Sequence, residues 1–158
     1  RITRPQVVGT IFVENAHAFT AYTDGRTKER VDGMMSTGDV GHFDENGLLF
    51  IDGRDDDMIV SGGENVFPQE VEHLIAARPD VLEAAVVGVD DRDFGKRLRA
   101  FVVPGPDSAR DPQKIKDYVK ENLARYKVPR DVIFLDELPR NATGKLLRTA
   151  LTETDPTA

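Results

Sequence analysis

Residues 68–89, PQEVEHLIAARPDVLEAAVVGV, decide the fold class, because they predict a helix that is followed closely by an apolar strand. Pro68 suits the first position of a helix, where its missing N–H leaves no hydrogen bond unmade. The apolar residues of this segment recur at the spacing of one helix face: Val71, Leu74 and Ile75. Arg78-Pro79 marks the end of the helix, and residues 81–89 form an apolar, valine-rich run that predicts a core strand.

The alternation of strands and helices continues on both sides of this stretch. Asp111-Pro112 supplies a cap and a first helical residue. Apolar side chains follow them at helical spacing: Ile115, Val119 and Leu123. Further short strands are expected at residues 58–60, 98–103 and 132–135. The order β-α-β-β-α-β predicts a small α+β domain in which the helices pack against a mixed sheet.

The residues before this domain predict strands and loops without helices. Residues 7–14 are apolar and β-branched enough for a strand, and Asp24-Gly25 marks a turn after it. Residues 44–47, DENG, are typical of a hairpin turn between strands at 40–43 and 48–51. We therefore expect residues 1–55 to be the β-rich end of a larger preceding domain, and residues 56–158 to be a separate C-terminal domain.

Composition excludes several classes of function. Hydrophobic residues make up 39% of the 158 residues, which is enough for a core and argues against global disorder. The net charge of −7 argues against a general nucleic-acid or anionic-membrane surface. The chain has no cysteine, which excludes thiol catalysis, disulfides and thiolate metal sites. No apolar run approaches the ~20 residues that span a bilayer, and the start shows neither an initiator methionine nor a signal peptide, so we expect the chain to begin within a longer protein.

Asp39 and Arg54 are the first candidates for a binding site. Asp39 follows Thr37-Gly38, and a carboxylate accepts hydrogen bonds only, so it can hold two vicinal hydroxyl groups such as those of ribose. Arg54 follows a strand and could hold the other side of the ribose. The alternatives are a turn aspartate that bonds nearby backbone, and a surface ion pair between Arg54 and the acidic run 55–57. That run does not fit the calcium-loop template, and the histidines form no ligand pattern, so no metal site is expected in this chain.

Two glycine-containing turns provide the other candidates. Gly62-Gly63 predicts either a plain β-turn or a close approach of the backbone to a ligand or to another segment. Residues 139–148, PRNATGKLLR, place Lys145 in a polar loop, with an exposed lysine at a helix start as the alternative. This loop is not a phosphate-binding P-loop, because the earlier glycine and the following serine or threonine are absent.

These motifs, in this order and spacing, resemble the acyl-CoA synthetases of the adenylate-forming enzyme superfamily. The resemblance runs from about Val8 to about Leu151. It is carried by Asp39, Arg54, the acidic run 55–57, residues 61–66 (SGGENV), residues 68–72 (PQEVE) and the loop with Lys145. In this family a large N-terminal domain is followed by a mobile C-terminal domain. The resemblance implies that residues 1–55 end the large adenylating domain and that residues 56–158 form the mobile one.

The resemblance also implies a role for each candidate residue. Asp39 would bind the ribose hydroxyls of ATP or of the acyl-adenylate, and Arg54 would support the same ribose. Lys145 would bridge the substrate carboxylate and the α-phosphate, and Asp56 would be the hinge about which the domain rotates between two half-reactions. The residues implied in CoA binding are Gly62 and Gly63 on the pantetheine path, Phe94 against the adenine, and Tyr126, Lys127 and Arg130, for which a plain surface loop is the alternative.

The implied reaction uses ATP with Mg²⁺, a small carboxylic acid, expected to be a fatty acid, and CoA as the acceptor. The loop that cradles the ATP phosphates, most of the Mg²⁺ site and the acid pocket would lie in the N-terminal domain, upstream of Arg1, so we expect this chain alone not to catalyse adenylation. The alternatives are an adenylating enzyme that passes the acyl group to a carrier-protein thiol or to oxygen, and a non-catalytic module that retains the fold. Neither a nucleic-acid nor a membrane partner is expected, and the expected location is cytoplasmic.

Overall fold

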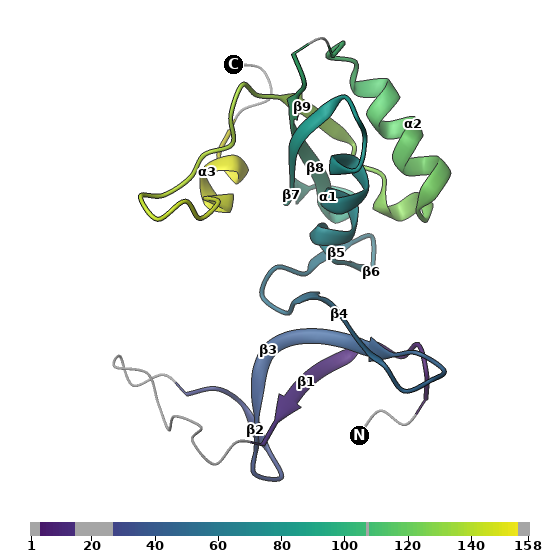
Figure 1. Ribbon diagram of the computed structural model, residues 1–158, viewed down its shortest axis with the longest axis vertical. Coiled ribbons are helices and arrows are strands. Elements are labelled where there is room, and N and C mark those ends of the chain that lie inside the picture. Colours follow the sequence, from purple (N-terminus) through teal and green to yellow (C-terminus); the bar gives the residue numbers. More distant parts are fainter. Residues whose placement is uncertain (1–3, 15–26, 107, 155–158) are drawn as a thin grey trace. The chain divides into compact units, whose positions relative to one another are not determined.

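The computed structural model describes residues 4–14, 27–106 and 108–154, and the predicted turn at Asp24-Gly25 lies outside them. The chain divides into two compact units, Arg1–Asp57 and Met58–Ala158, each with its own sheet (Figure 1). This division falls two residues after the one we expected from the sequence. The correspondence of the two units to the end of a large adenylating domain and to a mobile domain stays a prediction.

The first unit contains an antiparallel sheet in which one long strand pairs with three shorter ones. β3 (Met34–Phe43) pairs with β1 (Gly9–Val13), β2 (Arg30–Val31) and β4 (Leu49–Arg54). The predicted hairpin between β3 and β4 is confirmed. Its turn forms because the Asp44 carboxylate accepts the backbone N–H groups of Asn46 at 2.9 Å and of Leu48 at 2.8 Å.

The second unit is the predicted α+β domain with a mixed sheet. Four of its strands run in the order β6-β5-β8-β7, and a fifth, β9, lies parallel to β8. The strands are β5 (Ile59–Ser61), β6 (Glu64–Val66), β7 (Val81–Asp91), β8 (Gly95–Pro104) and β9 (Asp131–Phe134). The helices are α1 (Pro68–Ala76), α2 (Pro112–Asn122), the 3₁₀ turn η1 (Arg125–Lys127) and α3 (Arg148–Thr152). We did not predict β6 or η1, and a helix near α3 entered only in the alternative given for Lys145.

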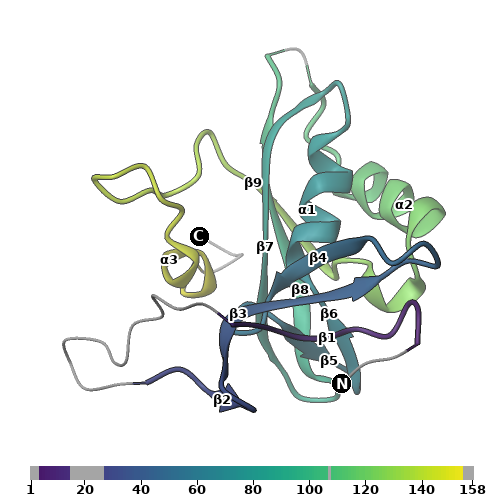
Figure 2. The same ribbon diagram turned by 60° about the horizontal axis from the view of Figure 1, so that its bottom comes forward.

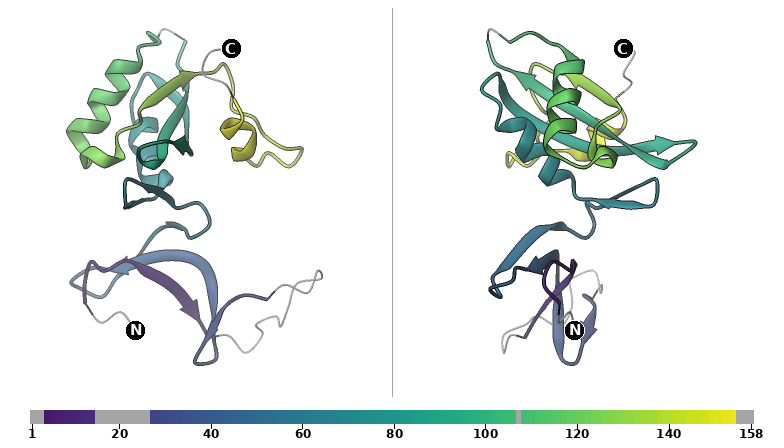
Figure 3. Two further views of the ribbon diagram at one scale, coloured as in Figure 1. Left: turned by 180° about the vertical axis from the view of Figure 1, so that it is seen from behind. Right: turned by 90° about the vertical axis from the view of Figure 1, so that its right-hand side faces the viewer.

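Both faces of the β7–β8 hairpin are buried, which explains why residues 81–89 are apolar almost throughout. Alternate residues such as Val86 and Ala100 pack with α1 and α2 on one face. The residues between them, including Val87 and Phe101, pack with Leu151 of α3 on the other face. Figures 2 and 3 show α1 and α2 on one side of this hairpin and α3 on the other.

The predicted faces of the two longer helices are confirmed. In α1, Val71 and Ile75 are fully buried and Leu74 packs at the edge of the same core. In α2, the Asp111 carboxylate caps the helix by accepting the N–H of Gln113 at 2.9 Å. The apolar face of α2 also points inward, with Ile115 and Val119 buried and Leu123 partly buried.

Candidate functional site

Asp39 and Arg54 lie directly opposite each other on β3 and β4 in the first unit. Nη1 of Arg54 is 3.3 Å from Oδ1 of Asp39, and Nε of Arg54 donates to Oδ1 of Asp56 at 3.1 Å. The Arg54 guanidinium group therefore contacts both Asp39, the residue expected to bind ribose, and Asp56, the residue expected to be the hinge. Asp39 lies in a strand and its carboxylate meets Arg54, so the alternative of a turn aspartate does not describe it, whereas the predicted ion pair of Arg54 with the acidic run is present.

A bulge in β3 presents Asp39 beside Arg54. Thr10 pairs with Val40 and Phe12 with Ser36, so the three residues 37–39 of β3 face the single residue Ile11 of β1. The Thr37 hydroxyl donates to the carbonyl of Ile11 at 3.2 Å and accepts the N–H of Asp39 at 3.0 Å, which replaces hydrogen bonds that the bulge interrupts. Gly38 has a φ angle of 81°, a region that side chains disfavour, so both the threonine and the glycine before Asp39 support this backbone geometry.

The Asp39 carboxylate is accessible to a ligand. Its side chain is 31% exposed and that of Arg54 is 43% exposed. The pKa of Arg54 is raised above its ordinary value, first by the hydrogen bond to Asp56 and by the charge of that carboxylate. A partly exposed carboxylate that contacts the Arg54 guanidinium through one oxygen keeps lone pairs with which it can accept hydrogen bonds from two neighbouring hydroxyl groups.

The loop that carries Lys145 is built around the side chain of Asn141. Oδ1 of Asn141 accepts the N–H groups of Thr143 at 3.0 Å and of Lys145 at 2.8 Å, and the Thr143 hydroxyl at 2.8 Å. The backbone N–H of Asn141 donates to the carbonyl of Lys145 at 2.9 Å. Both backbone polar groups of Lys145 are therefore held inside the loop.

The side chain of Lys145 is exposed, and among residues 4–14, 27–106 and 108–154 no hydrogen bond or ion pair involves its ammonium group. Helix α3 starts at Arg148, three residues later, so Lys145 belongs to the loop and not to the helix start. A fixed backbone with an unengaged cation can place one positive charge next to an anionic ligand.

A pocket of about 490 Å³ lies at the end of the second unit formed by the β5–β6 turn, the β7–β8 turn and η1. It is lined by Ser61, Gly62, Glu64, Phe94, Arg97, Leu98, Arg125, Tyr126, Val128 and Arg130. Four of these were singled out from the sequence: Gly62, Phe94, Tyr126 and Arg130. Two others, Ser61 and Glu64, lie in the motif at residues 61–66 but were not predicted as site residues. The rest were not predicted, because their local pattern is that of ordinary strand and loop residues: Arg97, Leu98, Arg125 and Val128.

Phe94 has a defined environment at the mouth of this pocket. The Arg130 guanidinium lies 4.1 Å from the centre of the Phe94 ring, a cation–π contact. The backbone N–H of Gly62 donates to the carbonyl of Phe94 at 3.0 Å, and a side chain at Gly62 would lie only 2.9 Å from the ring. The close approach predicted for the Gly62-Gly63 turn is therefore an approach to Phe94. The ring itself is 41% exposed and can stack on a flat ligand.

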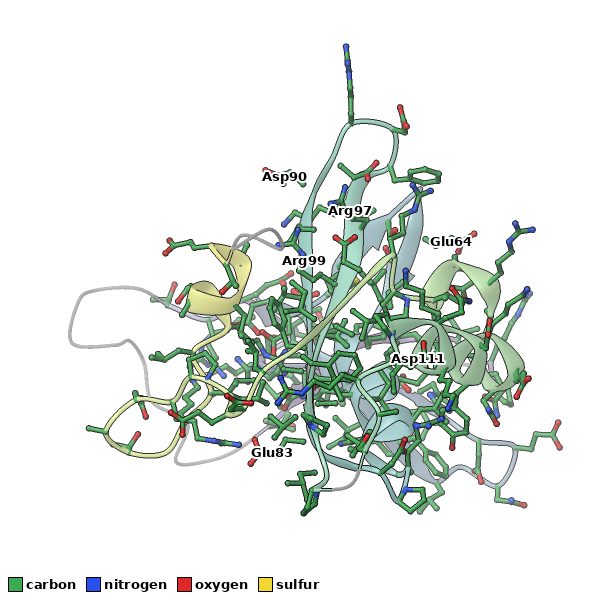
Figure 4. The ribbon with its side chains drawn as sticks, turned by 90° about the horizontal axis from the view of Figure 1, so that it is seen from above. Glu64, Glu83, Asp90, Arg97, Arg99 and Asp111 are labelled. Atoms are coloured by element: carbon green, nitrogen blue, oxygen red, sulfur yellow. The ribbon has the colours of Figure 1, made fainter. Side chains whose placement is uncertain are left out.

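Two other cationic side chains near this pocket, Arg97 and Lys127, form ion pairs with carboxylates of the same unit. Arg97 pairs with Asp91 at 3.2 Å and with Asp131 at 3.0 Å, and Figure 4 shows Arg97 next to Arg99 on this part of the sheet. The backbone N–H of Asp93, and after it the hydrogen bond from Arg97, hold the pKa of Asp91 below its ordinary value. Lys127 does not line the pocket, because its ammonium group pairs with Glu70 of α1. Its role in CoA binding stays a prediction.

The described residues do not provide a metal site. In those parts of the chain, no group of three or more histidine, aspartate or glutamate side chains could hold a metal ion. The Mg²⁺ site that the resemblance implies was expected mostly in the upstream domain, and it stays a prediction. Within the same residues, no helix is both long and apolar enough to cross a bilayer.

Comparison with known sequences gives consistent matches. Residues 70–145 match the family described as "AMP-binding enzyme C-terminal domain". The chain is 48% identical over 117 residues to a 2-succinylbenzoate–CoA ligase of Bacillus licheniformis, covering 74% of this chain and 24% of that protein. It is 42% identical over 146 residues to an indoleacetate–CoA ligase of Aromatoleum aromaticum, covering 90% and 29%. It is 46% identical over 121 residues to the long-chain-fatty-acid–CoA ligase FadD13 of Mycobacterium tuberculosis, covering 77% and 24%.

Solved structures match over nearly the whole chain. The o-succinylbenzoate CoA synthetase MenE of Bacillus subtilis, in complex with its acyl-adenylate intermediate, superposes with a TM-score of 0.85 at 37% identity, covering 96% of this chain and 32% of that one. The amide bond synthetase McbA of Marinactinospora thermotolerans superposes with a TM-score of 0.82 at 33% identity, covering 94% and 31%. The chain spans about a quarter to a third of the length of these relatives.

Proposed function

Since this chain belongs to the adenylate-forming enzyme superfamily and contains its C-terminal domain, we propose that it works as part of an ATP-dependent acid–CoA ligase. The ligase would form acyl-AMP and pyrophosphate from a carboxylic acid and ATP, and would then transfer the acyl group to the CoA thiol with release of AMP. The observation that carries the proposal is the Lys145 loop, in which Asn141 and the loop backbone hold an exposed lysine whose ammonium group has no partner among the described residues. This scaffold can hold one positive charge in place next to an anionic ligand.

In the first half-reaction Lys145 would sit between two anions. The carboxylate of the acid attacks the α-phosphate of ATP, and pyrophosphate leaves as acyl-AMP forms. The approach of two negative groups is unfavourable, and a preorganised cation offsets the repulsion as charge builds in the transition state. Loss of one such contact costs roughly 3–4 kcal/mol of transition-state stabilisation. Asp39 would hold the ribose hydroxyls during this step, and Arg54 would support the same ribose.

In the second half-reaction the pocket of the second unit would bind CoA. Phe94, backed by the Arg130 guanidinium, offers a stacking surface for the adenine ring. Tyr126 lines the same pocket, and Gly62 and Gly63 form the turn beside it, where the missing side chains would leave room for the pantetheine arm. Asp56 would be the hinge between the two half-reactions, and its hydrogen bond with Arg54 would change as the backbone rotates.

The names of the relatives bear on the type of acid. The relatives are named for 2-succinylbenzoate, indoleacetate and long-chain fatty acids, so their names favour a carboxylic acid without selecting one type. A fatty acid is our first candidate. A cytoplasmic location and an upstream domain that completes the ATP, Mg²⁺ and acid sites belong to the same proposal.

Formation of AMP and acyl-CoA tests the proposal in the complete polypeptide that carries these residues, with short-, medium- and long-chain fatty acids and with aryl acids. Lys145→Ala should lower acyl-AMP formation by about 10²–10³-fold, the equivalent of the lost contact. The matched control is Lys120→Ala, which removes an exposed lysine outside the loop, on α2. It should form acyl-AMP at the parent rate. Equal rates for the two variants would contradict the role given to Lys145.

A second candidate is an adenylating enzyme with an acceptor other than CoA, such as a carrier-protein thiol. The similarity to McbA supports it, because that protein is named as an amide bond synthetase. Acyl-AMP that forms but is not consumed on addition of CoA would favour this candidate. Absence of adenylate with every acid, together with no binding of an acyl-AMP analogue at millimolar concentration, would favour the non-catalytic module.

A further inference from the structure

At one point on the edge of the second sheet, the backbone hydrogen-bonding groups are satisfied by two side chains that form an ion pair, Glu72 and Arg148. β7 is the edge strand of the order β6-β5-β8-β7, and Val86 at its middle is fully buried. The N–H of Val86 donates to Oε1 of Glu72 at 2.7 Å, and its carbonyl accepts from Nη1 of Arg148 at 2.9 Å. These are the two backbone groups that a further strand would otherwise satisfy.

Glu72 and Arg148 also bind each other through two parallel contacts. Nη1 of Arg148 lies 2.5 Å from Oε1 of Glu72, and Nη2 lies 3.0 Å from Oε2. The side chains are 11% and 27% exposed, so solvent screens this pair less than an ordinary surface ion pair. A bidentate pair of this kind fixes direction as well as distance. The start of α3 is therefore held at a defined position along β7.

This position matters because Arg148 follows Lys145 by only three residues. The bonds of Asn141 give the loop its internal shape, but they do not attach it to the sheet. A second attachment, from Arg140 to Glu83 at 2.8 Å, has side chains that are 46% and 44% exposed and is correspondingly weak. Leu151 packs α3 against the sheet through apolar contacts, which resist separation more than sliding. Nη1 of Arg99 on β8 also donates to the carbonyl of Thr154 at 2.9 Å, which holds the far end of α3. The Glu72–Arg148 pair is the directional attachment to the sheet nearest to Lys145 in the sequence, and it opposes sliding of the loop along β7.

We propose that Glu72 and Arg148 are positioning residues for Lys145, which they hold at the height along β7 where its ammonium group reaches the reacting carboxylate and phosphate. This inference rests on the proposed function of Lys145. It gives a catalytic consequence to two residues whose side chains bond each other and the backbone of Val86. Both would act on adenylation alone, since the transfer to CoA does not use Lys145.

The test separates the two half-reactions in the complete polypeptide that carries these residues. Acyl-AMP formation is measured from ATP and acid, and thioester formation from preformed acyl-AMP and CoA. Glu72→Gln, which keeps an acceptor for the N–H of Val86 but removes the charge, should slow adenylation by about 10- to 100-fold, as expected for a displaced catalytic group. Arg148→Lys, which keeps the charge but loses the two-pronged geometry, should slow it in the same range. Thioester formation should stay within about twofold for both.

Asp80→Asn is the matched control. It breaks another bidentate pair, between Arg78 and Asp80 at 2.9 and 2.8 Å, in the same unit but without a bond to the loop. Its two half-reactions should stay at the parent rates. The double variant Glu72→Gln/Lys145→Ala should form acyl-AMP at the same rate as Lys145→Ala alone. Once the Lys145 ammonium group is gone, its position no longer affects the rate.

The rates of these variants distinguish the positioning role of Glu72 and Arg148 from the catalytic role of Lys145. If Lys145→Ala is inactive in adenylation while Glu72→Gln and Arg148→Lys keep the parent rate, the positioning role is wrong and the proposed function stands. Equal slowing of both half-reactions by Glu72→Gln and Arg148→Lys would mean a purely structural pair and would also overturn the inference. Parent-rate adenylation by Lys145→Ala would overturn the inference and the role of Lys145 together.

Discussion

Alanine variants of Gly62 and Gly63 should separate two losses of folding stability. One comes from the positive φ angle at both positions, and the other from the steric clash of a Cβ atom at Gly62 with the Phe94 ring. Gly62 and Gly63 form the turn between β5 and β6 with φ angles of 60° and 87°, a region that side chains disfavour. A Cβ atom at Gly62 would lie 2.9 Å from Cδ1 of Phe94, whereas nothing lies within 4 Å of a Cβ atom at Gly63. Gly63→Ala is therefore a control that shares the backbone penalty and lacks the steric one.

The magnitudes follow from these contacts. The left-handed backbone costs roughly 1–2 kcal/mol for either alanine variant. At Gly62, the Phe94 ring must also move, and an off-rotamer shift costs about 0.5–1.5 kcal/mol. Loss of the Arg130 contact with the displaced ring adds about 0.5–1 kcal/mol. Gly62→Ala should thus lower the free energy of unfolding by about 1–2.5 kcal/mol more than Gly63→Ala does, from the sum of the last two terms.

Urea unfolding of the 158-residue chain measures this difference directly. In the Phe94→Ala background the two glycine variants should become equal, because the atom that Gly62 avoids is gone. In the complete polypeptide, Gly62→Ala should also raise the KM for CoA more than Gly63→Ala, since it displaces the proposed adenine contact. Equal losses of stability for the two variants in the presence of Phe94 would refute the reasoning.

Two further predictions concern stability. The hydrogen bond from Arg78 holds the pKa of Asp80 below its ordinary value, so this carboxylate contributes stability that is complete above about pH 4 and is lost as the pH falls through the lowered pKa. Asp80→Asn should accordingly show a flatter dependence of urea stability on pH below about pH 4, and identical slopes for parent and variant would contradict this. Phe101 is fully buried, so Phe101→Ala should cost about 3–5 kcal/mol in thermal or urea unfolding. Phe94→Ala, at an exposed ring, should cost less than about 1 kcal/mol, and similar losses for the two would place Phe101 outside the core.

The longer elements of the second unit were predictable because their signals are local. The spacing of Val71, Leu74 and Ile75 and the cap at Asp111 each depend on a few neighbouring residues, and the structure confirms them. The elements that were missed, β6 and η1, and α3, which entered only in the alternative given for Lys145, have three to five residues each. Elements of this length form through contacts with the rest of the fold, because propensity alone does not stabilise them.

The candidate site was predictable only in part. Motif order singled out Asp39, Arg54 and Lys145, and four of the six residues proposed for CoA line one pocket. Their roles stay predictions. The sequence contained no sign that Lys127 would pair with Glu70, 57 positions away. A surface lysine and one held by a distant glutamate have the same local pattern.

What the sequence determined by itself was the α+β class, the main helices and strands with their buried faces, and the residues able to carry charge or accept hydroxyl groups. Only the tertiary structure decided which of these residues meet. Glu72 and Arg148 are 76 positions apart and close the edge of β7 at Val86, a bond that depends on how the chain returns to the sheet. Periodicity and capping act over a few residues, whereas an ion pair between distant segments depends on the packing of every element between them.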